Sequence, residues 1–190
     1  MVTTTSVRDR LLSSATLLLR SRGADGFGVA ELLASSGVAR RSMYQHFPDG
    51  KAEVLRVATA EAGKGVGALL KAMLDEMPAL DALDVWVQQW IDLYVETDYA
   101  IGCPLAAASL SAPEYPAAAA EAAVAFRRFE SLIADALVRD GLDAAEATTA
   151  AAVLVFGLEG AIVTARARRD IAPFRALADH ARSVWGPRLA

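Results

Sequence analysis

Six polar side chains between residues 40 and 46 are the part of this sequence best suited to recognition chemistry. Each of them can donate a hydrogen bond to a phosphate oxygen or to the edge of a base. Val38, Met43 and Phe47 recur at spacings of five and four, which predicts an apolar face that holds a short helix on its scaffold. Gly37 suits the tight turn before this helix, because glycine has no Cβ to clash at positive φ. The pattern is typical of a helix-turn-helix and indicates DNA binding. The six residues are Arg40, Arg41, Ser42, Tyr44, Gln45 and His46.

The other residues capable of chemistry do not form a catalytic or metal-binding set. The chain has two histidines and one cysteine, far apart in the sequence, so we expect no metal site and no resident cofactor. No nucleophile stands beside a base and no carboxylates cluster, so we expect no enzyme, although a small-molecule enzyme stays an alternative. A single cysteine excludes an intramolecular disulfide and fits a reducing cytoplasm, where we expect the protein to work.

Charge is distributed unevenly along the chain. Residues 1–56 carry eight Lys or Arg and five Asp or Glu, a net charge of +3, whereas residues 57–190 carry eleven against eighteen, a net charge of −7. A basic head on an acidic body gives a favourable potential where a DNA duplex would dock. The overall charge of −4 therefore does not argue against a DNA partner.

Apolar periodicity predicts about nine helices and no strands, so the fold class is all-α. A first amphipathic helix is expected over about residues 6–22, ended by Gly23, and a short second helix is expected around Val29–Leu33. Later helices are expected at residues 51–77, 80–99, 105–110, 116–139, 143–169 and 173–184.

Membrane insertion and secretion are not expected. The apolar stretch from Ala144 to Ala165 is interrupted by Glu146 and Glu159. Met1–Ser6 is polar and lacks a charged leader followed by an apolar stretch, so the sequence predicts no signal peptide.

Two sets of motifs resemble the TetR family of transcriptional regulators. The first is Val29-Ala-Glu-Leu-Leu-Ala-Ser-Ser-Gly-Val38 followed by Tyr44-x-His46-Phe47 and then Lys51. The second is Gly102-Cys-Pro-Leu-Ala-Ala107 with Gly157-Leu-Glu-Gly-Ala161, which is similar to the ligand domain of the LmrA/YxaF-like subgroup. The resemblance covers essentially the whole chain.

The resemblance implies a ligand-responsive repressor with two domains. Residues 1–50 would form a three-helix helix-turn-helix domain, and residues 51–190 a ligand-binding and dimerisation domain. A homodimer would bind a palindromic double-stranded DNA operator, and a small hydrophobic or aromatic effector would release it. A DNA-binding protein without any small-molecule ligand stays an alternative.

The DNA contacts that the resemblance implies depart from the family pattern at two places. Phe27 and Gly28 stand where the family usually has Thr at the start of its second helix, so a phosphate contact there must come from backbone N–H groups or another residue. Arg41 stands where the family usually has Gly. The complete expected set is Gly28, Ala39, Arg40, Arg41, Ser42, Tyr44, Gln45, His46 and Lys51.

An effector pocket is expected around a stripe of aromatic residues. Trp86, Trp90 and Tyr94 stand at i, i+4 and i+8 on one helix, and large aromatics with a few polar groups fit a mostly apolar cavity. Ordinary core packing would explain the stripe equally well. The expected pocket residues are Trp86, Gln89, Trp90, Tyr94, Cys103, Phe126, Phe129, Phe156 and Glu159.

The last two helices are expected to form the dimer interface. They carry small and apolar residues nearly all round, which a monomer would not leave in water. Burial of some of these residues within the protomer's own core is the alternative, with one face turned inward and one toward the partner. The expected interface residues are Leu154, Gly157, Leu158, Ala161, Ala165, His180 and Val184.

Overall fold

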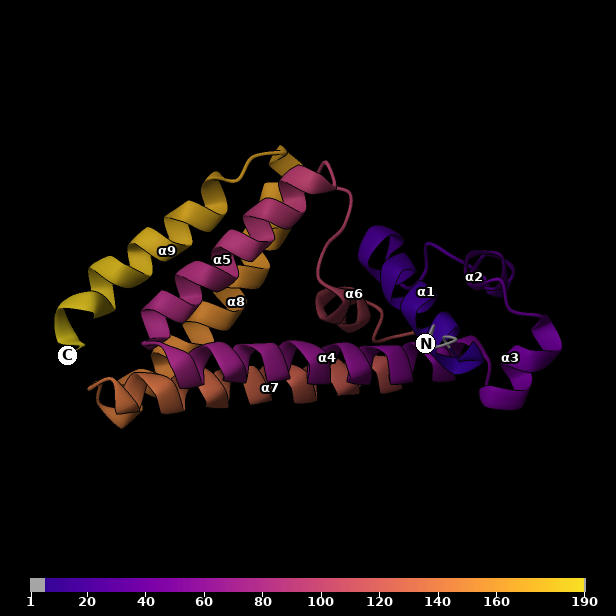
Figure 1. Ribbon diagram of the computed structural model, residues 1–190, viewed down its shortest axis with the longest axis horizontal. Coiled ribbons are helices and arrows are strands. Elements are labelled where there is room, and N and C mark those ends of the chain that lie inside the picture. The colour runs from indigo at the N-terminus through magenta and orange to yellow at the C-terminus, as the bar shows by residue number, and fades with distance from the viewer. Residues whose placement is uncertain (1–5, 190) are drawn as a thin grey trace, which may run out of the picture. The chain divides into compact units, whose positions relative to one another are not determined.

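A computed structural model describes residues 6–189, so Met1–Thr5, most of the polar start considered above, lie outside the described part. Within it the chain forms nine α-helices, one short 3₁₀-helix and no strand, which confirms the all-α prediction (Figure 1). Most helix bounds fall within one or two residues of those expected. The helices are α1 (Val7–Arg22), α2 (Val29–Ser36), α3 (Arg40–His46), α4 (Lys51–Glu76), α5 (Ala79–Glu96), α6 (Pro104–Leu110), α7 (Pro116–Arg139), α8 (Ala144–Arg168) and α9 (Ala172–Trp185), followed by η1 (Gly186–Arg188).

The helices group into two compact units that do not follow the chain in simple order. The first unit extends to Lys64 and also contains Cys103–Val124, whereas the second contains Gly65–Gly102 and the chain from Ala125 onward. Helices α4 and α7 each contribute to both units. Because it includes Cys103–Val124, the first unit contains α6 in addition to the three N-terminal helices.

Helix α1 is the centre of the first unit and packs against α2, α3 and α6. It begins where the Ser6 hydroxyl accepts a hydrogen bond from the Asp9 N–H (3.1 Å), and it ends at Gly23, whose φ of 75° lies in the left-handed region. Leu11 and Leu19 are fully buried on its inner face. Each such leucine contributes about 1.5–3 kcal/mol to folding, so this face holds the small unit together.

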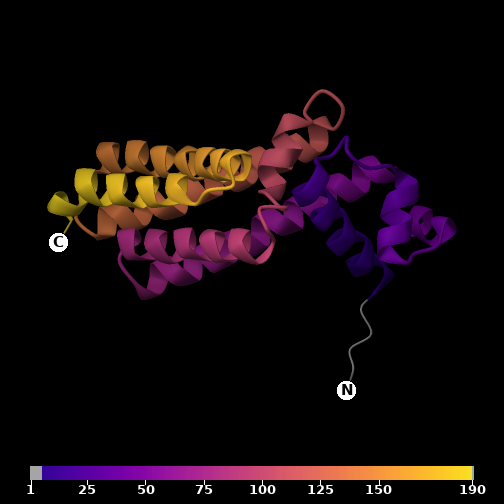
Figure 2. The ribbon, with the colours of Figure 1, turned by 90° about the horizontal axis from the view of Figure 1, so that it is seen from above.

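The second unit is built around α5, α8 and α9, which contact one another in pairs; α8 and α9 lie side by side in Figure 2. Tyr94 of α5 is fully buried and donates its hydroxyl to the carbonyl of Ile162 in α8 (2.7 Å). Helix α8 is long and apolar enough to cross a membrane by length and composition alone. That is weak evidence for a span, because the core helix of a folded protein passes the same test, and 44% of the α8 window is buried here.

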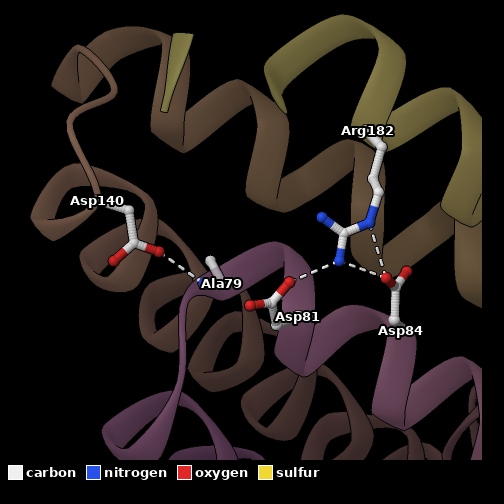
Figure 3. A network of polar contacts seen from close by, with 5 residues as sticks. All are labelled: Ala79, Asp81, Asp84, Asp140 and Arg182. Atoms are coloured by element: carbon white, nitrogen blue, oxygen red, sulfur yellow. Dashed lines mark hydrogen bonds and ion pairs between the residues drawn. The ribbon is translucent and has the colours of Figure 1, made fainter. Parts of the chain in front are cut away.

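Charged residues fix the corner between α4 and α5. Arg139, at the end of α7, donates to the carbonyl of Leu74 (2.7 Å), and Asp140 accepts from the N–H of Ala79 (2.6 Å). One residue thus caps the C-terminus of α4 and its neighbour caps the N-terminus of α5. Figure 3 shows the Asp140 cap near the ion pairs of Arg182.

Arg182 joins α9 to the first turns of α5. Its Nη2 donates to Asp81 (2.6 Å) and its Nε donates to Asp84 (2.7 Å) (Figure 3). Hydrogen bonds with Asp81 and then Asp84 raise the pKa of the Arg182 guanidinium above its ordinary value. All three groups are about half exposed, so the pairs orient the helices more than they stabilise them.

A second ionic link joins the ends of α5 and α8. Arg169 caps α8 in the left-handed conformation (φ 53°) and pairs with Asp98, which also has a positive φ (50°). The hydrogen bond and charge of Arg169 lower the pKa of the Asp98 carboxyl, and the same partner raises the pKa of Arg169. Arg169 also lies over the ring of Tyr99 at 5.5 Å, so it holds the turn after α5.

Candidate nucleic-acid interface

Helices α2 and α3 are joined by the tight turn that the sequence predicts. Gly37 ends α2 in the left-handed conformation, with a φ of 62°, and its N–H bonds to the carbonyl of Leu33. Arg10 of α1 reaches the carbonyl of Gly37 (3.5 Å) and so ties the turn to the first helix. Sequence reasoning missed this role of Arg10, because nothing in its spacing separates it from other exposed arginines.

Helix α3 has one buried face and one exposed face. Val38, Met43 and Phe47 are buried, which confirms the expected apolar attachment. The opposite face is polar and cationic. Ala39, Arg40, Arg41, Tyr44, Gln45 and His46 are exposed, and Ser42 is half-buried. A short helix with these donors on one exposed face has the chemistry of a groove-reading element.

Tyr44 lies against the backbone of the turn that follows α3. Gly50 has a φ of 66°, and a Cβ added there would lie 3.2 Å from Cε1 of the Tyr44 ring. The glycine therefore serves both the turn and the close approach of the ring. Tyr44 keeps 42% of its surface exposed although its ring packs against this turn.

The start of α2 supplies backbone donors in place of a capping side chain. Gly28 is the N-cap, is exposed and makes no side-chain cap hydrogen bond, while Phe27 before it is buried as core. The first N–H groups of a helix have no partners within the helix, and the helix dipole is positive there. This arrangement can hold a phosphate through the backbone.

Lys51 departs from its predicted role as a phosphate contact. Its ammonium group is half-buried and donates to the carbonyls of Ala24 and Phe27, each at 2.6 Å. It also lies over the rings of Phe27 (4.5 Å) and Tyr115 (4.9 Å). A cation with two short hydrogen bonds and two ring faces would have to give up these partners to reach DNA. The geometry therefore favours a structural role for Lys51 over the predicted one.

The expected pocket residues on α5 and α7 form two aromatic groups in the second unit. Trp86 and Phe126 both meet Phe129 edge-on, with ring centres 6.2 and 6.3 Å apart. Trp90 stacks on Phe174 of α9 at 6.5 Å and meets Tyr94 at 5.9 Å. Sequence reasoning missed Phe174, because an aromatic near the start of a late helix carries no signal of its partners.

The other residues expected in the pocket differ in burial and position. Phe156 is 62% exposed on the outer face of α8, and Gln89 is exposed on α5. Cys103 is buried in the first unit, whereas the aromatic groups belong to the second. Tyr94 is fully buried with its hydroxyl bonded to a carbonyl, so it is a core residue. Glu159 is half-buried on α8 and has one buried carboxylate oxygen.

Helix α8 turns most of the expected interface residues inward. Four of them are buried within the protomer, which argues against a contact of their side chains with a partner. Gly157 is half-buried, and a Cβ there would lie 2.8 Å from Cδ1 of Leu177, so it serves close packing against α9. His180 is exposed and Val184 is half-buried. The four buried residues are Leu154, Leu158, Ala161 and Ala165.

The outer face of α8 carries a different apolar stripe. Phe156 and Val163, seven residues apart, are 62% and 57% exposed, and the exposed Gly160 lies between them. Two turns of helix separate the two side chains, so they share one face.

Among residues 6–189 no group of three or more His, Cys, Asp or Glu residues could hold a metal ion.

Comparisons with known proteins agree with this geometry. Residues 11–58 match the family model described as bacterial regulatory proteins of the tetR family. Residues 79–180 match the model described as transcriptional regulator LmrA/YxaF-like, C-terminal domain. An HTH-type transcriptional regulator of Mycobacterium tuberculosis is 35% identical over 172 residues, covering 87% of each chain. The regulator YxaF of Bacillus subtilis is 25% identical over 175 residues, covering 90% of this chain and 91% of that protein.

Solved structures share the fold. A TetR transcriptional regulator from Legionella pneumophila superposes with a TM-score of 0.83 at 15% identity, covering 96% of this chain and 98% of that one. The regulator CifR, whose cysteine mutant was crystallised with a 26-base-pair operator duplex, superposes with a TM-score of 0.75 at 22% identity, covering 94% and 96%. With its helix-turn-helix head and its LmrA/YxaF-like C-terminal domain, this chain belongs to the TetR family of bacterial transcriptional regulators.

Proposed function

We propose that this regulator is a homodimeric repressor that a small hydrophobic or aromatic effector releases from a palindromic operator. The observation that carries the DNA part is the exposed cationic face of α3 opposite its buried Met43 and Phe47. Arg40 and Arg41 reach bases or phosphates of the major groove, and the backbone at Gly28 holds a phosphate. Operator DNA lies in the cytoplasm, which is where the protein works.

Two copies of the chain meet through the outer face of α8. Phe156, Gly160 and Val163 give that face an apolar stripe, and the small Gly160 permits close approach of a partner helix. A two-fold dimer makes the same stripe meet itself. Two recognition helices then read half-sites about one helical turn, or a small multiple of it, apart.

The effector binds in the second unit, next to the aromatic groups of Trp86 and Trp90. Large aromatic walls with few polar groups suit an apolar or aromatic ligand. Release follows if the ligand binds better to a state in which the two recognition helices are wrongly spaced. A hundredfold loss of occupancy requires a preference of roughly 2.7 kcal/mol for that state.

Selection of duplexes from random DNA with the purified protein tests the DNA part. We expect enrichment of palindromes, and a duplex carrying one half-site should bind far more weakly than the full site. Enrichment of no sequence above background would contradict the proposal. If the protein binds duplexes without any sequence choice, the DNA-binding alternative without a regulated operator becomes the better account.

Screening of small aromatic and apolar compounds tests the effector part. A true effector should change tryptophan fluorescence and release the selected duplex at the same concentrations. Trp90→Ala should weaken that response while keeping DNA affinity. Its thermal unfolding must be measured too, because truncating a core tryptophan costs about 3–5 kcal/mol. A screen in which compounds bind but none alters DNA binding favours a protein without a regulatory ligand.

A further inference from the structure

The Lys51 ammonium group joins three segments of the first unit. It bonds to the carbonyls of Ala24 and Phe27 in the turn between α1 and α2, and it stands at the first residue of α4. The ring of Tyr115 lies over it at 4.9 Å. Tyr115 comes from the turn between α6 and α7, more than sixty residues away in the sequence.

Tyr115 is held firmly to both of its neighbouring helices. Its N–H bonds to the carbonyl of Ser111 just after α6 (2.8 Å), and its own carbonyl accepts from Ala118 (3.0 Å) and Ala119 (3.2 Å) in the first turn of α7. Glu121 of α7 also pairs with Arg56 of α4 at 3.2 Å. The position of the ring therefore follows the position of the α6–α7 turn.

We propose that Tyr115 is a positioning residue for DNA binding, which acts through Lys51 on the start of α2. The inference rests on the proposed DNA-binding function. A cation over an aromatic face is stabilised electrostatically. The Tyr115 ring therefore helps to keep the ammonium group hydrogen-bonded to the carbonyls of Ala24 and Phe27. Those carbonyls belong to the segment that leads into Gly28, where the α2 backbone holds a phosphate. If the α6–α7 turn moves, the ring leaves the ammonium group and the start of α2 loosens.

In this role Lys51 supports DNA binding through its contacts within the first unit rather than through a contact to DNA. Its three N–H donors suit two carbonyls and leave a compact charge for two ring faces. It also connects the α6–α7 turn directly to the start of α2 within one compact unit.

Hydrogen exchange and DNA binding of the full-length protein test the inference together. Tyr115→Leu removes the ring, Tyr115→Phe keeps it, and Leu110→Ala changes a side chain in α6 that is 83% exposed. Amide exchange is measured without DNA over residues 24–32, and affinity for the selected duplex is measured across a range of salt concentrations.

For Tyr115→Leu we expect faster exchange confined to residues 24–32 and a loss of affinity of about three- to tenfold. The slope of log affinity against log salt should not change, because no phosphate contact is removed. Tyr115→Phe and Leu110→Ala should both match the wild type. Lys51→Met should reproduce the local exchange of Tyr115→Leu.

Three outcomes would overturn the inference. Unchanged exchange and affinity in Tyr115→Leu would show that the ring positions nothing. Faster exchange throughout the first unit with a matching loss of thermal stability would make Tyr115 an ordinary core residue. A slope lowered by about one in Lys51→Met, with exchange unchanged, would restore Lys51 as a phosphate contact. Failure of the wild type to bind any duplex would instead contradict the proposed function, and the wild-type control distinguishes that case.

Discussion

Arg41 is the residue at which this chain adds a charge to the recognition helix where its family usually has none. The side chain is exposed on the same face as Arg40, Tyr44 and Gln45. Arg41→Ala should weaken operator binding. If Arg41 contacts a phosphate, the salt slope should fall by about 0.9 and all duplexes should weaken alike. If it contacts a base, discrimination at one position should fall by about 1–3 kcal/mol.

A matched control for Arg41 is available in the second unit. Arg168 is also exposed, near the end of α8, so Arg168→Ala removes the same charge away from α3. That variant should keep both the affinity and the salt slope. Equal behaviour of the two variants would mean that only net charge matters and that Arg41 makes no contact.

The ion pair between Asp98 and Arg169 gives stability a dependence on acid pH. Because Arg169 lowers the pKa of Asp98, the pair contributes above the ordinary aspartate value of about 4 and loses its contribution as pH falls through the lowered pKa. Asp98→Asn keeps a residue that tolerates positive φ and removes the charge. Thermal midpoints of variant and wild type should differ slightly at pH 7 and converge once the pH has fallen below the lowered pKa of Asp98. A difference that is the same at every pH would assign it to packing.

At the scale of single residues, sequence reasoning worked where one face of a short helix must be apolar. Val38, Met43 and Phe47 were expected to attach α3 to the core and are all buried, so the exposed donors between them followed. The contacts of Lys51 could not be predicted, because its partners are two backbone carbonyls and the rings of residues 27 and 115. Backbone carbonyls have no sequence signature, and a distant ring cannot be matched to a lysine by spacing.

Helix α8 shows why a whole element can be predicted and still be turned the wrong way. Its bounds were expected within one residue, but small and apolar residues lie nearly all round it, so no clear periodicity distinguishes its inner face. Leu158 and Phe156 look equally suited to a core, yet the first is buried and the second is 62% exposed. Only packing against α5 and α9 decides the rotation of such a helix.

The stripe on α8 leads to a prediction about assembly. Phe156→Glu should convert a dimer into a monomer, because the carboxylate would be buried without a partner against its own copy. Leu110→Glu places the same charge on an exposed leucine of α6 and should leave the dimer intact. Sedimentation velocity of both variants measures the difference. A stable Phe156→Glu dimer would move the interface to another face.

Glycines in the middle of α4 lead to a prediction about the stability of the protein. Gly65 is exposed, and a Cβ added there meets no atom within 4 Å, so no packing requires a glycine. Gly65→Ala should stabilise the protein by about 0.5–1 kcal/mol in chemical unfolding. Gly67→Ala should gain less, because its Cβ would lie 3.3 Å from the buried ring of Phe129. Loss of stability in Gly65→Ala would mean that the helix needs the freedom of glycine there.

At the scale of the whole molecule, the first unit is discontinuous in sequence. Helix α6 packs against α1, but in the sequence residues 65–102, which belong to the second unit, separate α6 from the first helices. We therefore expect that a fragment ending at Lys64 has lower helicity and lower thermal stability than the same residues have in the full chain. Circular dichroism and hydrogen exchange of the fragment measure this. A fragment as protected from exchange as the intact protein would make α6 dispensable.

The same interruption governs how the protein is made. A ribosome synthesises the recognition helix early, but it must translate α5 and then α6 before the partner of α1 emerges. A nascent chain paused before residue 103 still exposes the surface of α1 that α6 will cover, which is the kind of surface that chaperones bind. The first unit can thus complete its packing only late in translation, although the residues expected to contact DNA are among the first to leave the ribosome.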